Sequence, residues 1–455
     1  RLLAAWHDIG KFNLGFQAKS EPGARLRAGH VREVLCLFER ACDESEQLGK
    51  ALTIEALSHW GQDELTIFQL LIAAICHHGR PLPIGGDLRV DLWAPSATMN
   101  PFAGVSRLRA AVATWFPDAF VPGGDPLPAS PELQHAFSGL VMLADWIGSD
   151  RDAFPFREPE DHADRFGFAS ERAAMVLARM GMATARAREK LGSVSFNSVS
   201  PHSPRPAQSA IASLGIQESA SVVVLEGETG SGKTECALLH FLRLFGAGLV
   251  DGMYFALPTR TSATQIHERV TASVQRAFPG AELRPPVILA VPGYLKVDTT
   301  SGTALPGFEV LWNDDDRERW RFRGWAGESA KRYLAGSIVV GTIDQVLLST
   351  LTVSHAHMRA TALSRLLLVV DEVHASDAYM NRLLEAVLAR HRKCGGHALL
   401  MSATLGSTAR SRLLEPGRTP QSVSLNEAVR MPYPAITRRL GHGSVSIEPV
   451  HEATQ

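Results

Sequence analysis

Residues 221–234, SVVVLEGETGSGKT, join an apolar run to a glycine-rich turn that ends in Lys-Thr. Glycines in such a turn let backbone N–H groups close on phosphate oxygens, and the helix that follows presents its positive end to the anion. The lysine can reach the β- and γ-phosphates, and the threonine can ligate Mg²⁺. A flexible strand–helix turn is the alternative, but the flanking strand and helix favour a site for ATP and Mg²⁺. Its predicted residues are Gly227, Thr229, Gly230, Gly232, Lys233 and Thr234.

An acidic pair, Asp371-Glu372, follows a second apolar run, Leu366–Val370. Behind a phosphate loop such a pair has two tasks. Asp371 helps to hold Mg²⁺, and Glu372 orients and deprotonates the attacking water. An acidic pair at the end of a strand is usually a solvated turn, but the upstream phosphate loop favours the catalytic interpretation.

Histidines and aspartates near the N-terminus have the composition of a second site. Imidazole nitrogens together with a carboxylate suit divalent transition-metal ions, and a carboxylate can bridge two of them. Such a pair of ions activates water and clamps the attacking and leaving oxygens of a phosphodiester. Because the chain has 17 histidines, spacing alone leaves an ordinary core or surface role open for them. The candidate ligands are His7, Asp8, His30, His77, His78 and Asp145, and Lys11 is placed to stabilise developing negative charge.

The order of three motifs resembles the motor of superfamily 2 helicases: the phosphate loop, then Asp-Glu-x-His at residues 371–374, then Ser402-Ala403-Thr404. The resemblance implies that Gln208 contacts the adenine edge, with an ordinary polar residue at a helix start as the alternative. It also implies that His374, Ser402 and Thr404 couple hydrolysis to movement. The residues matching positions that touch single-stranded nucleic acid in that superfamily are Thr259, Arg260, Thr342, Asp344 and Gln345.

Residues 317–325 interleave arginines with two tryptophans. A groove in which bases stack on the indole rings and a solvated loop with its tryptophans in the core are equally compatible with this pattern.

The elements that must position these residues change in character along the chain. Residues 1–190 show apolar positions at helical spacing, whereas short β-runs alternate with helices from Gln208 onward. That alternation predicts a parallel sheet with helices on both faces and ligands at the carboxyl ends of its strands. We therefore expect an all-α domain at 1–190, a linker at 191–207, an α/β RecA-like P-loop domain at 208–430 and a connecting segment at 431–455. The candidate strands are Ser221–Glu226, Met253–Leu257, Val287–Val291, Ser337–Gly341, Leu366–Val370 and His397–Ser402.

Composition narrows the possible partners and the compartment. The formal net charge is −1, so nucleic-acid binding must depend on local basic patches. Five scattered cysteines indicate reduced thiols in the cytoplasm. The longest apolar run, near Leu65–Cys76, is too short to span a bilayer, so no membrane association is expected.

Taken together, the motifs resemble one family, the CRISPR-associated helicase–nucleases of type I systems, in which an HD-type nuclease domain precedes a superfamily 2 motor. The match runs over most of the chain, from His7-Asp8-Ile-Gly10-Lys11-Phe12 to Ser402-Ala403-Thr404-Leu405. Its most specific part is the Ala-x-Asp-Ala-Tyr-Met run that follows Asp-Glu-x-His.

The resemblance implies an antiviral enzyme that is recruited by an RNA-guided surveillance complex. It would nick and degrade single-stranded DNA at the metal site, using one or two transition-metal ions, and translocate with ATP. Asp8, Lys11 and Glu372 are the implied catalytic residues, and we expect a monomer.

Two departures from the family pattern lead us to expect a chain truncated at both ends. The family has a further metal-binding histidine upstream of the His-Asp pair, and a second RecA-like lobe that supplies arginine fingers. We expect the 455-residue chain to bind ATP weakly, to hydrolyse it poorly and to be unable to translocate.

Two other functions compete with this one: an HD phosphohydrolase that acts on nucleotides under a regulatory ATPase, and a helical module that only docks the motor on a partner. The sequence does not indicate the metal, the CRISPR subtype, the polarity of translocation or the docking surface.

Overall fold

The computed structural model describes residues 1–39, 41–79, 89–155, 164–306, 309–375, 377–416, 418–419, 423–439 and 443–451. It contains two compact units. The first consists of Arg1–Phe166 and Val353–Thr361, and the second of Gly167–Thr352 and Ala362–Gln455.

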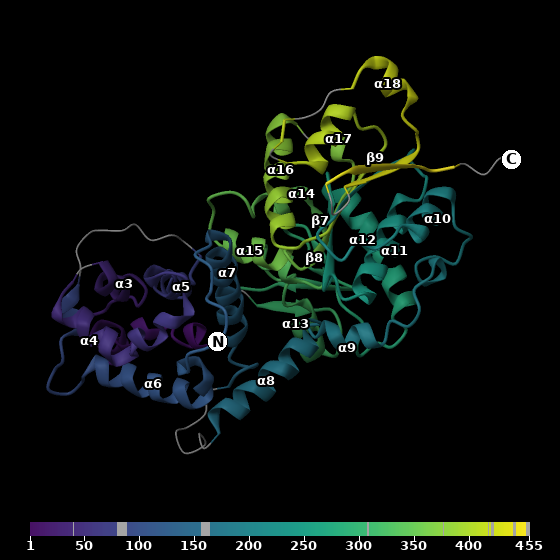
Figure 1. Ribbon diagram of the computed structural model, residues 1–455. Coiled ribbons are helices and arrows are strands. Elements are labelled where there is room, and N and C mark those ends of the chain that lie inside the picture. The colour runs from purple at the N-terminus through teal and green to yellow at the C-terminus, as the bar shows by residue number, and fades with distance from the viewer. Residues whose placement is uncertain are drawn as a thin grey trace. The chain divides into compact units, whose positions relative to one another are not determined.

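The first unit is all-helical in its described residues, as predicted (Figure 1). Its core includes the fully buried side chains of Trp6, Ile9, Leu71 and Trp93. The α-helices are α1 (Leu2–Ala5), α2 (Leu14–Gln17), α3 (Arg32–Glu39), α4 (Asp43–Leu52), α5 (Glu64–Ile75), α6 (Pro101–Trp115) and α7 (Pro131–Gly148). The 3₁₀ turns are η1 (Ile9–Phe12), η2 (Ala18–Ser20), η3 (Ile54–Trp60), η4 (Val90–Trp93) and η5 (Pro117–Phe120).

Two capped helices of this unit, α5 and α7, carry candidate metal ligands at or near their C-terminal ends. Asp63 accepts hydrogen bonds from the backbone N–H groups of Leu65 and Thr66 and so fixes the start of α5. Helix α7 begins with the Ser130 side chain capping Leu133 N–H and with Pro131 in the first turn. Because the starts of α5 and α7 are fixed by these caps, the positions of their C-terminal ends, which carry the candidate ligands, are fixed as well.

The second unit is built on one mixed sheet, in the order β11-β10-β1-β9-β8-β2-β7-β3-β4-β5-β6. The central six strands pair in parallel, and they are the six that the sequence predicts. They are β1 (Val222–Glu226), β2 (Gly252–Leu257), β3 (Val287–Ala290), β7 (Ile338–Thr342), β8 (Leu366–Val370) and β9 (Ala398–Ser402). The predicted fold class, an all-α domain followed by a RecA-like α/β domain, is confirmed.

Both edges of the sheet are antiparallel, which the sequence analysis did not anticipate. The edge strands are β4 (Lys296–Val297), β5 (Thr300–Ala304), β6 (Val310–Trp312), β10 (Ala435–Arg439) and β11 (Val445–Pro449). Strand β10 pairs with β1 and then with β11, so part of the segment 431–455 completes the sheet instead of only leading away from it. Hairpin pairing satisfies backbone groups that the parallel core leaves open at its edge.

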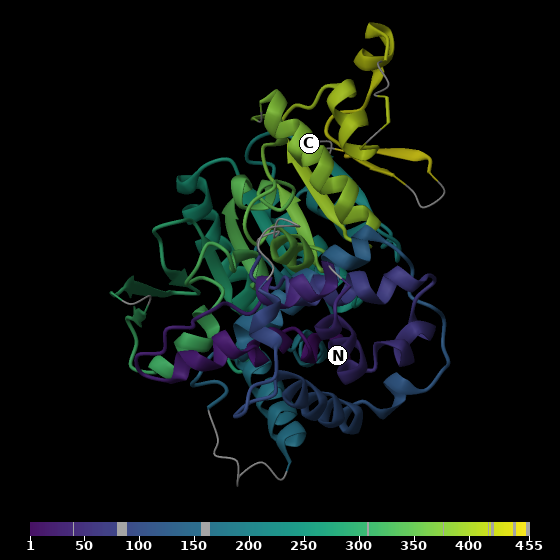
Figure 2. The same ribbon diagram turned by 90° about the vertical axis from the view of Figure 1, so that its left-hand side faces the viewer.

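Helices cover both faces of the sheet. Helices α11 and α12 lie on one face and α16 on the other, and the two views agree on this (Figures 1 and 2). The α-helices of this part of the chain are α8 (Arg165–Arg179), α9 (Thr184–Glu189), α10 (Pro206–Ser213), α11 (Lys233–Gly246), α12 (Arg260–Ala277), α13 (Arg317–Gly324), α14 (Ile343–Leu347), α16 (Ala378–Lys393), α17 (Ser407–Leu414) and α18 (Leu425–Arg430). Most of α15 (Ala356–Leu363) belongs to the first unit. The 3₁₀ turns are η7 (Phe196–Ser198), η8 (Tyr333–Ala335) and η9 (Val373–Ala375).

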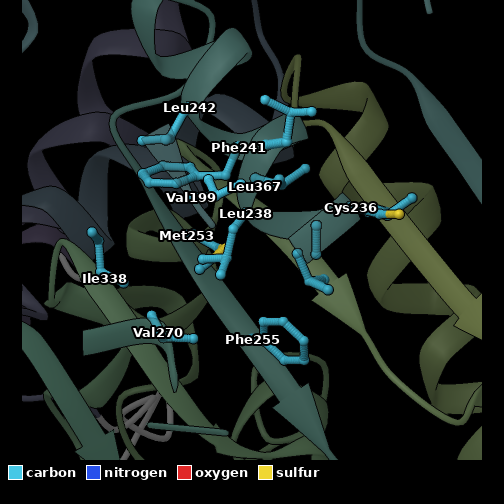
Figure 3. Close-up of a cluster of buried hydrophobic side chains, with 14 of the residues drawn as sticks. Val199, Cys236, Leu238, Phe241, Leu242, Met253, Phe255, Val270, Ile338 and Leu367 are labelled. Atoms are coloured by element: carbon cyan, nitrogen blue, oxygen red, sulfur yellow. The ribbon is translucent and has the colours of Figure 1, made fainter. Parts of the chain in front are cut away.

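The core of the second unit reaches further toward the N-terminus than the expected boundaries at 190 and 207. Figure 3 shows Val199 in the same apolar cluster as Phe241, Met253 and Leu367. Leu191 and Phe196 join it as well, so the expected linker is packed against the second unit. Helix α9 is held there too, because Arg188 donates to the Phe245 carbonyl at 2.6 Å and to Asp251 at 3.0 Å.

No described helix combines the length and the apolar character needed to cross a membrane.

Candidate functional site

The six candidate metal ligands of the first unit form one cluster, in which three histidines contact the Asp8 carboxylate. Asp8 Oδ1 lies 3.2 Å from His30 Nε2 and 3.6 Å from His77 Nε2, and Asp8 Oδ2 lies 3.3 Å from His7 Nε2. Asp145 Oδ1 lies 3.6 Å from His7 Nε2, and the Nε2 atoms of His78 and His30 are 3.0 Å apart. Segments far apart in the sequence therefore place six ligand-type side chains in one cluster.

The backbone explains how these side chains meet. His7 and Asp8 occupy the bend between α1 and η1, and His30 lies shortly before α3. His77 and His78 form the turn that ends α5, where Gly79 adopts a left-handed conformation with φ +72°. Asp145 lies in the last turn of α7. Four helix ends thus point their polar residues at one place.

The separations within the cluster fit metal coordination. Bonds of about 2.0–2.1 Å from a metal to nitrogen or oxygen, at angles between 90° and 109°, separate neighbouring ligand atoms by about 3 Å. Two triads have all their ligand atoms within 4.8 Å of one another, His7-Asp8-His77 and His30-His77-His78. Both triads contain His77, whose single facing nitrogen can bind one ion, while the six ligand-type side chains together are enough for one ion or two.

The electrostatics of the cluster favour a cation. Burial alone would raise the pKa of Asp8, but contacts with His30 and His7 hold that pKa well below its usual range. Burial lowers the pKa of His7, whereas the carboxylates of Asp145 and Asp8 outweigh it and raise that pKa to about 9. His7 Nε2 and Asp8 Oδ1 are buried and make no hydrogen bond. A divalent ion would satisfy both atoms, so the donor set fits the implied metal.

The imidazoles of His77 and His78 are poised as neutral ligands. Burial, followed by the charge of His7, lowers the pKa of His77 to about 4. Burial, followed by the nearby His30, also lowers the pKa of His78. Neutral imidazole is the form that binds a metal. Lys11, predicted to face developing negative charge, pairs with Asp8 Oδ2 at the more exposed side of the cluster.

The phosphate loop of the second unit connects β1 to α11, as predicted. Gly230 and Gly232 adopt left-handed conformations with φ of +84° and +86°. Lys233 is buried, and its Nζ donates to the carbonyls of Gly227 at 2.9 Å and Glu228 at 3.1 Å. The ammonium group therefore lies inside the loop that is expected to bind phosphate, while Thr234 is buried in the first turn of α11. Thr229 is exposed on the turn.

Gln208 contacts this loop directly. Its Nε2 donates to the Gly232 carbonyl at 3.2 Å, and its Oε1 accepts from Arg205 N–H at 2.8 Å. A Cβ atom at Gly232 would lie 2.0 Å from Gln208 Nε2, so the approach requires glycine. Adenine recognition by Gln208 stays a prediction, and in this structure its amide holds the phosphate loop to the start of α10.

The acidic pair lies at the carboxyl end of β8. Asp371 Oδ1 accepts from Glu372 N–H at 3.0 Å, and Glu372 has a left-handed φ of +54°. Burial, followed by the charge of Glu372, raises the pKa of Asp371. A left-handed non-glycine residue next to a phosphate loop is the kind of backbone strain that gathers at functional sites.

The residues expected to couple hydrolysis to movement, His374, Ser402 and Thr404, are hydrogen-bonded to one another. His374 Nδ1 lies 3.2 Å from Glu372 Oε2 and 2.9 Å from Ser402 Oγ. The Ser402 hydroxyl donates to the Thr404 carbonyl at 2.9 Å. Glu372 therefore lies against His374, which in turn contacts the Ser-Ala-Thr loop.

The residues expected to contact nucleic acid follow two neighbouring strands, because Leu257 in β2 pairs with Thr342 in β7. Thr259 and Arg260, at the start of α12, are exposed, as is Asp344 in α14. Thr342 and Gln345 are buried. Only part of the predicted set is therefore available to a ligand, and the assignment stays a prediction.

The open question on residues 317–325 is answered by burial. Trp320 and Trp325 are core residues, and Arg323 forms a buried pair with Asp298 at 2.7 Å. The two indole rings offer no stacking platform.

Sequence reasoning missed two groups. Arg410, on α17, donates to both carboxylate oxygens of Glu226, the last residue of β1, at 2.8 and 3.0 Å. This pair ties the segment after the Ser-Ala-Thr loop to the strand before the phosphate loop. The second group is Val353–Thr361, which packs in the first unit although it lies between elements of the second. Neither group has a short-range signature, because both depend on contacts between distant segments.

Comparison with known proteins relates both units to one family. Residues 1–154 match the family described as "Cas3, HD domain", and residues 205–288 match "DEAD/DEAH box helicase". The chain is 30% identical over 97% of its length to the CRISPR-associated endonuclease/helicase Cas3 of Escherichia coli, of which it covers 51%. It is 30% identical over 91% of its length to the protein of that name from Thermus thermophilus, of which it covers 44%. The chain thus spans about half the length of the curated relatives it matches.

Solved structures support the same fold. T. fusca Cas3 with AMPPNP has a TM-score of 0.67 at 22% identity, covering 100% of this chain and 50% of that one. A chain of a CRISPR RNA-guided surveillance complex in a pre-nicking state has a TM-score of 0.58 at 22% identity and covers 100% of this chain and 48% of that one.

Proposed function

The chain belongs to the Cas3 family of CRISPR-associated proteins, and from this premise we propose that its first unit cleaves single-stranded DNA and that its second unit supplies the ATP site of a motor that moves along DNA. The cleavage is endonucleolytic and exonucleolytic and depends on divalent metal ions. The observation that carries the nuclease proposal is the clustering of four histidines and Asp145 around the half-buried Asp8 carboxylate.

One or two divalent transition-metal ions bound here supply a water of lowered pKa and positive charge opposite a phosphodiester oxygen. His7, Asp8 and His77, or His30, His77 and His78, would hold an ion, and His77 would serve only one of them because a single ring nitrogen, Nε2, faces the cluster. Asp145 would complete the ligand set and also contacts His7. Lys11 places its ammonium group on the exposed side of Asp8, where a DNA phosphate can approach and be stabilised as its charge develops.

In the second unit, Lys233 and Thr234 bind the β- and γ-phosphates of ATP and its Mg²⁺, and Asp371 helps to hold that Mg²⁺. Glu372 takes a proton from the attacking water. The hydrogen-bonded chain through His374 and Ser402 then passes the change at Glu372 to the Ser-Ala-Thr loop.

The structural similarity to a chain of an RNA-guided surveillance complex supports recruitment of this protein to such a complex in antiviral defence. We place the protein in the cytoplasm, consistent with its scattered cysteines, and propose that it acts as a monomer.

The test is cleavage of single-stranded DNA by the 455-residue chain with Mn²⁺ or Co²⁺ as the only divalent ion. Wild type should degrade the DNA, and Asp8→Ala should abolish degradation. Asp118→Ala, which removes an exposed carboxylate of the same unit, is the matched control and should cleave like wild type. Release of phosphate from free nucleotides without loss of DNA would instead support a nucleotide phosphohydrolase. Absence of bound metal, with cleavage unchanged in a His77→Ala/His78→Ala variant, would support a docking role.

A further inference from the structure

The first unit contains a segment that the sequence places between α14 and β8 of the second. Residues Val353–Thr361 pack against residues 1–166 and count among the first compact unit. The match to the Cas3 HD domain ends at residue 154, so it does not include this segment. The helical unit that carries the metal cluster is thus completed by residues from another part of the sequence.

His355 touches the turn that carries two metal-ligand candidates. Its backbone N–H donates to the Gly79 carbonyl at 2.8 Å, immediately after His77 and His78. A Cβ atom at Gly79 would lie 2.8 Å from Cγ and Cδ2 of the His355 ring. The imidazole of His355 therefore lies directly on this turn.

The same ring touches the second ligand-bearing element, helix α7. The ring centroids of His355 and Trp146 are 5.0 Å apart in an edge-to-face arrangement with an interplanar angle of 72°. Trp146 directly follows Asp145 in the chain. His355 thus contacts both Gly79, which follows His78, and Trp146, which follows Asp145.

His355 is itself held firmly. It is buried, with a left-handed φ of +65°. Ser354 Oγ lies 2.6 Å from its Nδ1, and Arg359 donates to the Ser354 carbonyl at 2.9 Å. A left-handed non-glycine residue costs roughly 1–3 kcal/mol and persists only where its surroundings determine it, which is typical of functional sites.

Further along the segment, other contacts fix it to α7 away from the ligands. His357 stacks on His135 with ring centroids 4.3 Å apart. A Cβ atom at Gly139 would lie 2.4 Å from the His357 carbonyl oxygen and 2.2 Å from Thr361 Oγ1, so the helix and the segment are in direct backbone contact. These contacts give the segment a second anchor, which the ligand-bearing turn does not share.

We propose that His355 is a positioning residue of the metal centre, which fixes the spacing between the His77-His78 turn and Asp145 without binding the ion. The inference rests on the proposed metal-dependent function. Ligands that must meet one ion within a few tenths of an ångström need such outer support, and its loss typically weakens metal binding 10- to 100-fold.

The test is titration of the metal-free 455-residue chain with Co²⁺, read by calorimetry and by the d–d absorption bands, which report coordination geometry. His355→Ala should weaken Co²⁺ binding at least about tenfold and change the bands. His355→Phe keeps a ring against Gly79 and Trp146 and should restore both the affinity and the spectrum. His357→Ala is the matched control, because it removes a stacked ring from the same segment far from the ligands, and it should leave both unchanged.

Circular dichroism of each variant would show whether it folds. A second variant tests the same contact independently of His355→Ala. Trp146→Leu removes the other side of the same contact and should weaken Co²⁺ binding to a similar degree. The double variant should lose no more than the weaker-binding single variant, because both break one support. Additive losses, or wild-type affinity and bands in His355→Ala, would overturn the inference. Failure of wild type to bind Co²⁺ would instead overturn the proposed function.

Discussion

The metal cluster of the first unit and the phosphate loop of the second are built in opposite ways. The loop is one contiguous segment, Gly227–Thr234, between a strand and the helix that follows it. The cluster takes its ligands from bends and helix ends between His7 and Asp145, and its outer contacts from His355. A site made of neighbouring residues carries its own geometry, whereas a site made of distant residues depends on the packing of the whole unit.

The two sites also differ in how they use charge. The loop offers backbone N–H groups and one buried lysine to an anion, while the cluster offers carboxylates and imidazoles to a cation. The ligand-binding residues of one site can therefore be substituted without altering the ligand-binding groups of the other. Two predictions test that independence, and two more test what the second unit requires for its stability.

The largest effect is expected from His77→Ala, because His77 belongs to both ligand triads. DNA cleavage should fall about 1,000-fold, as loss of metal-assisted catalysis removes several kcal/mol of transition-state stabilisation. ATP affinity, measured with a fluorescent nucleotide, should stay at the wild-type value. His78→Ala, which affects one triad only, should lose less activity, and an equal loss would contradict the shared role of His77.

The reciprocal change is Lys233→Ala, which removes the cation within the phosphate loop. ATP hydrolysis should fall about 100-fold, as expected when one electrostatic contact to the transition state is lost. Affinity for Co²⁺ should not change. A parallel loss of Co²⁺ binding would show that the two sites are not independent.

Arg410→Ala tests whether the contiguous loop also depends on a distant residue. Glu226 is left as a buried, unpaired carboxylate at the end of β1, and breaking such a pair typically costs about 3–5 kcal/mol. We expect a lower melting temperature for the second unit and weaker ATP binding. Arg412→Ala, an exposed position on the same helix, is the control. Normal stability and ATP binding in Arg410→Ala would mean that the loop needs no such support.

The smallest effect concerns a histidine that has no metal to bind. His240, on α11, is fully buried with both ring nitrogens unpaired, and burial lowers its pKa to about 3. Below pH 6.5 the unfolded chain takes up a proton that the folded chain refuses, so stability falls as pH drops from 6.5 toward 3. The slope is at most about 1.4 kcal/mol per pH unit.

His240→Leu should remove that slope, and denaturant unfolding between pH 7 and 4.5 would measure it. His202→Leu, at an exposed position, should leave the slope unchanged. The same acid sensitivity in His240→Leu as in wild type would assign it to other groups.

Sequence patterns predicted the parts of the fold whose cause is local. Runs such as Val222–Glu226 and Leu366–Val370 are continuous apolar strands because both faces of a parallel sheet are covered. The phosphate loop and the acidic pair could be placed at their carboxyl ends for the same reason. The convergence of His7, Asp8 and Asp145 was inferred from residue types, with the family resemblance adding weight.

Pairings between distant segments could not be predicted in this way. Strand β5 (Thr300–Ala304) and strand β10 (Ala435–Arg439) are short and partly polar, and their pairing depends on the edge they meet. Phe196 and Val199 looked like parts of a linker because few apolar residues surround them, yet they fill the core of the second unit. The contacts of His355 could not be predicted for the same reason, since its partners Gly79 and Trp146 lie far away in the sequence.

Protein synthesis proceeds from the N-terminus, so α7 is synthesised long before residues 353–361 are added. Strands β1, β2, β3 and β7 emerge in between. The surface of α7 around Gly139 therefore stays uncovered by residues 353–361 while several strands of the second unit are synthesised. A nascent chain interrupted before His355 would contain every candidate ligand from His7 to Asp145 but would lack the segment that packs against the turn after His78 and against α7.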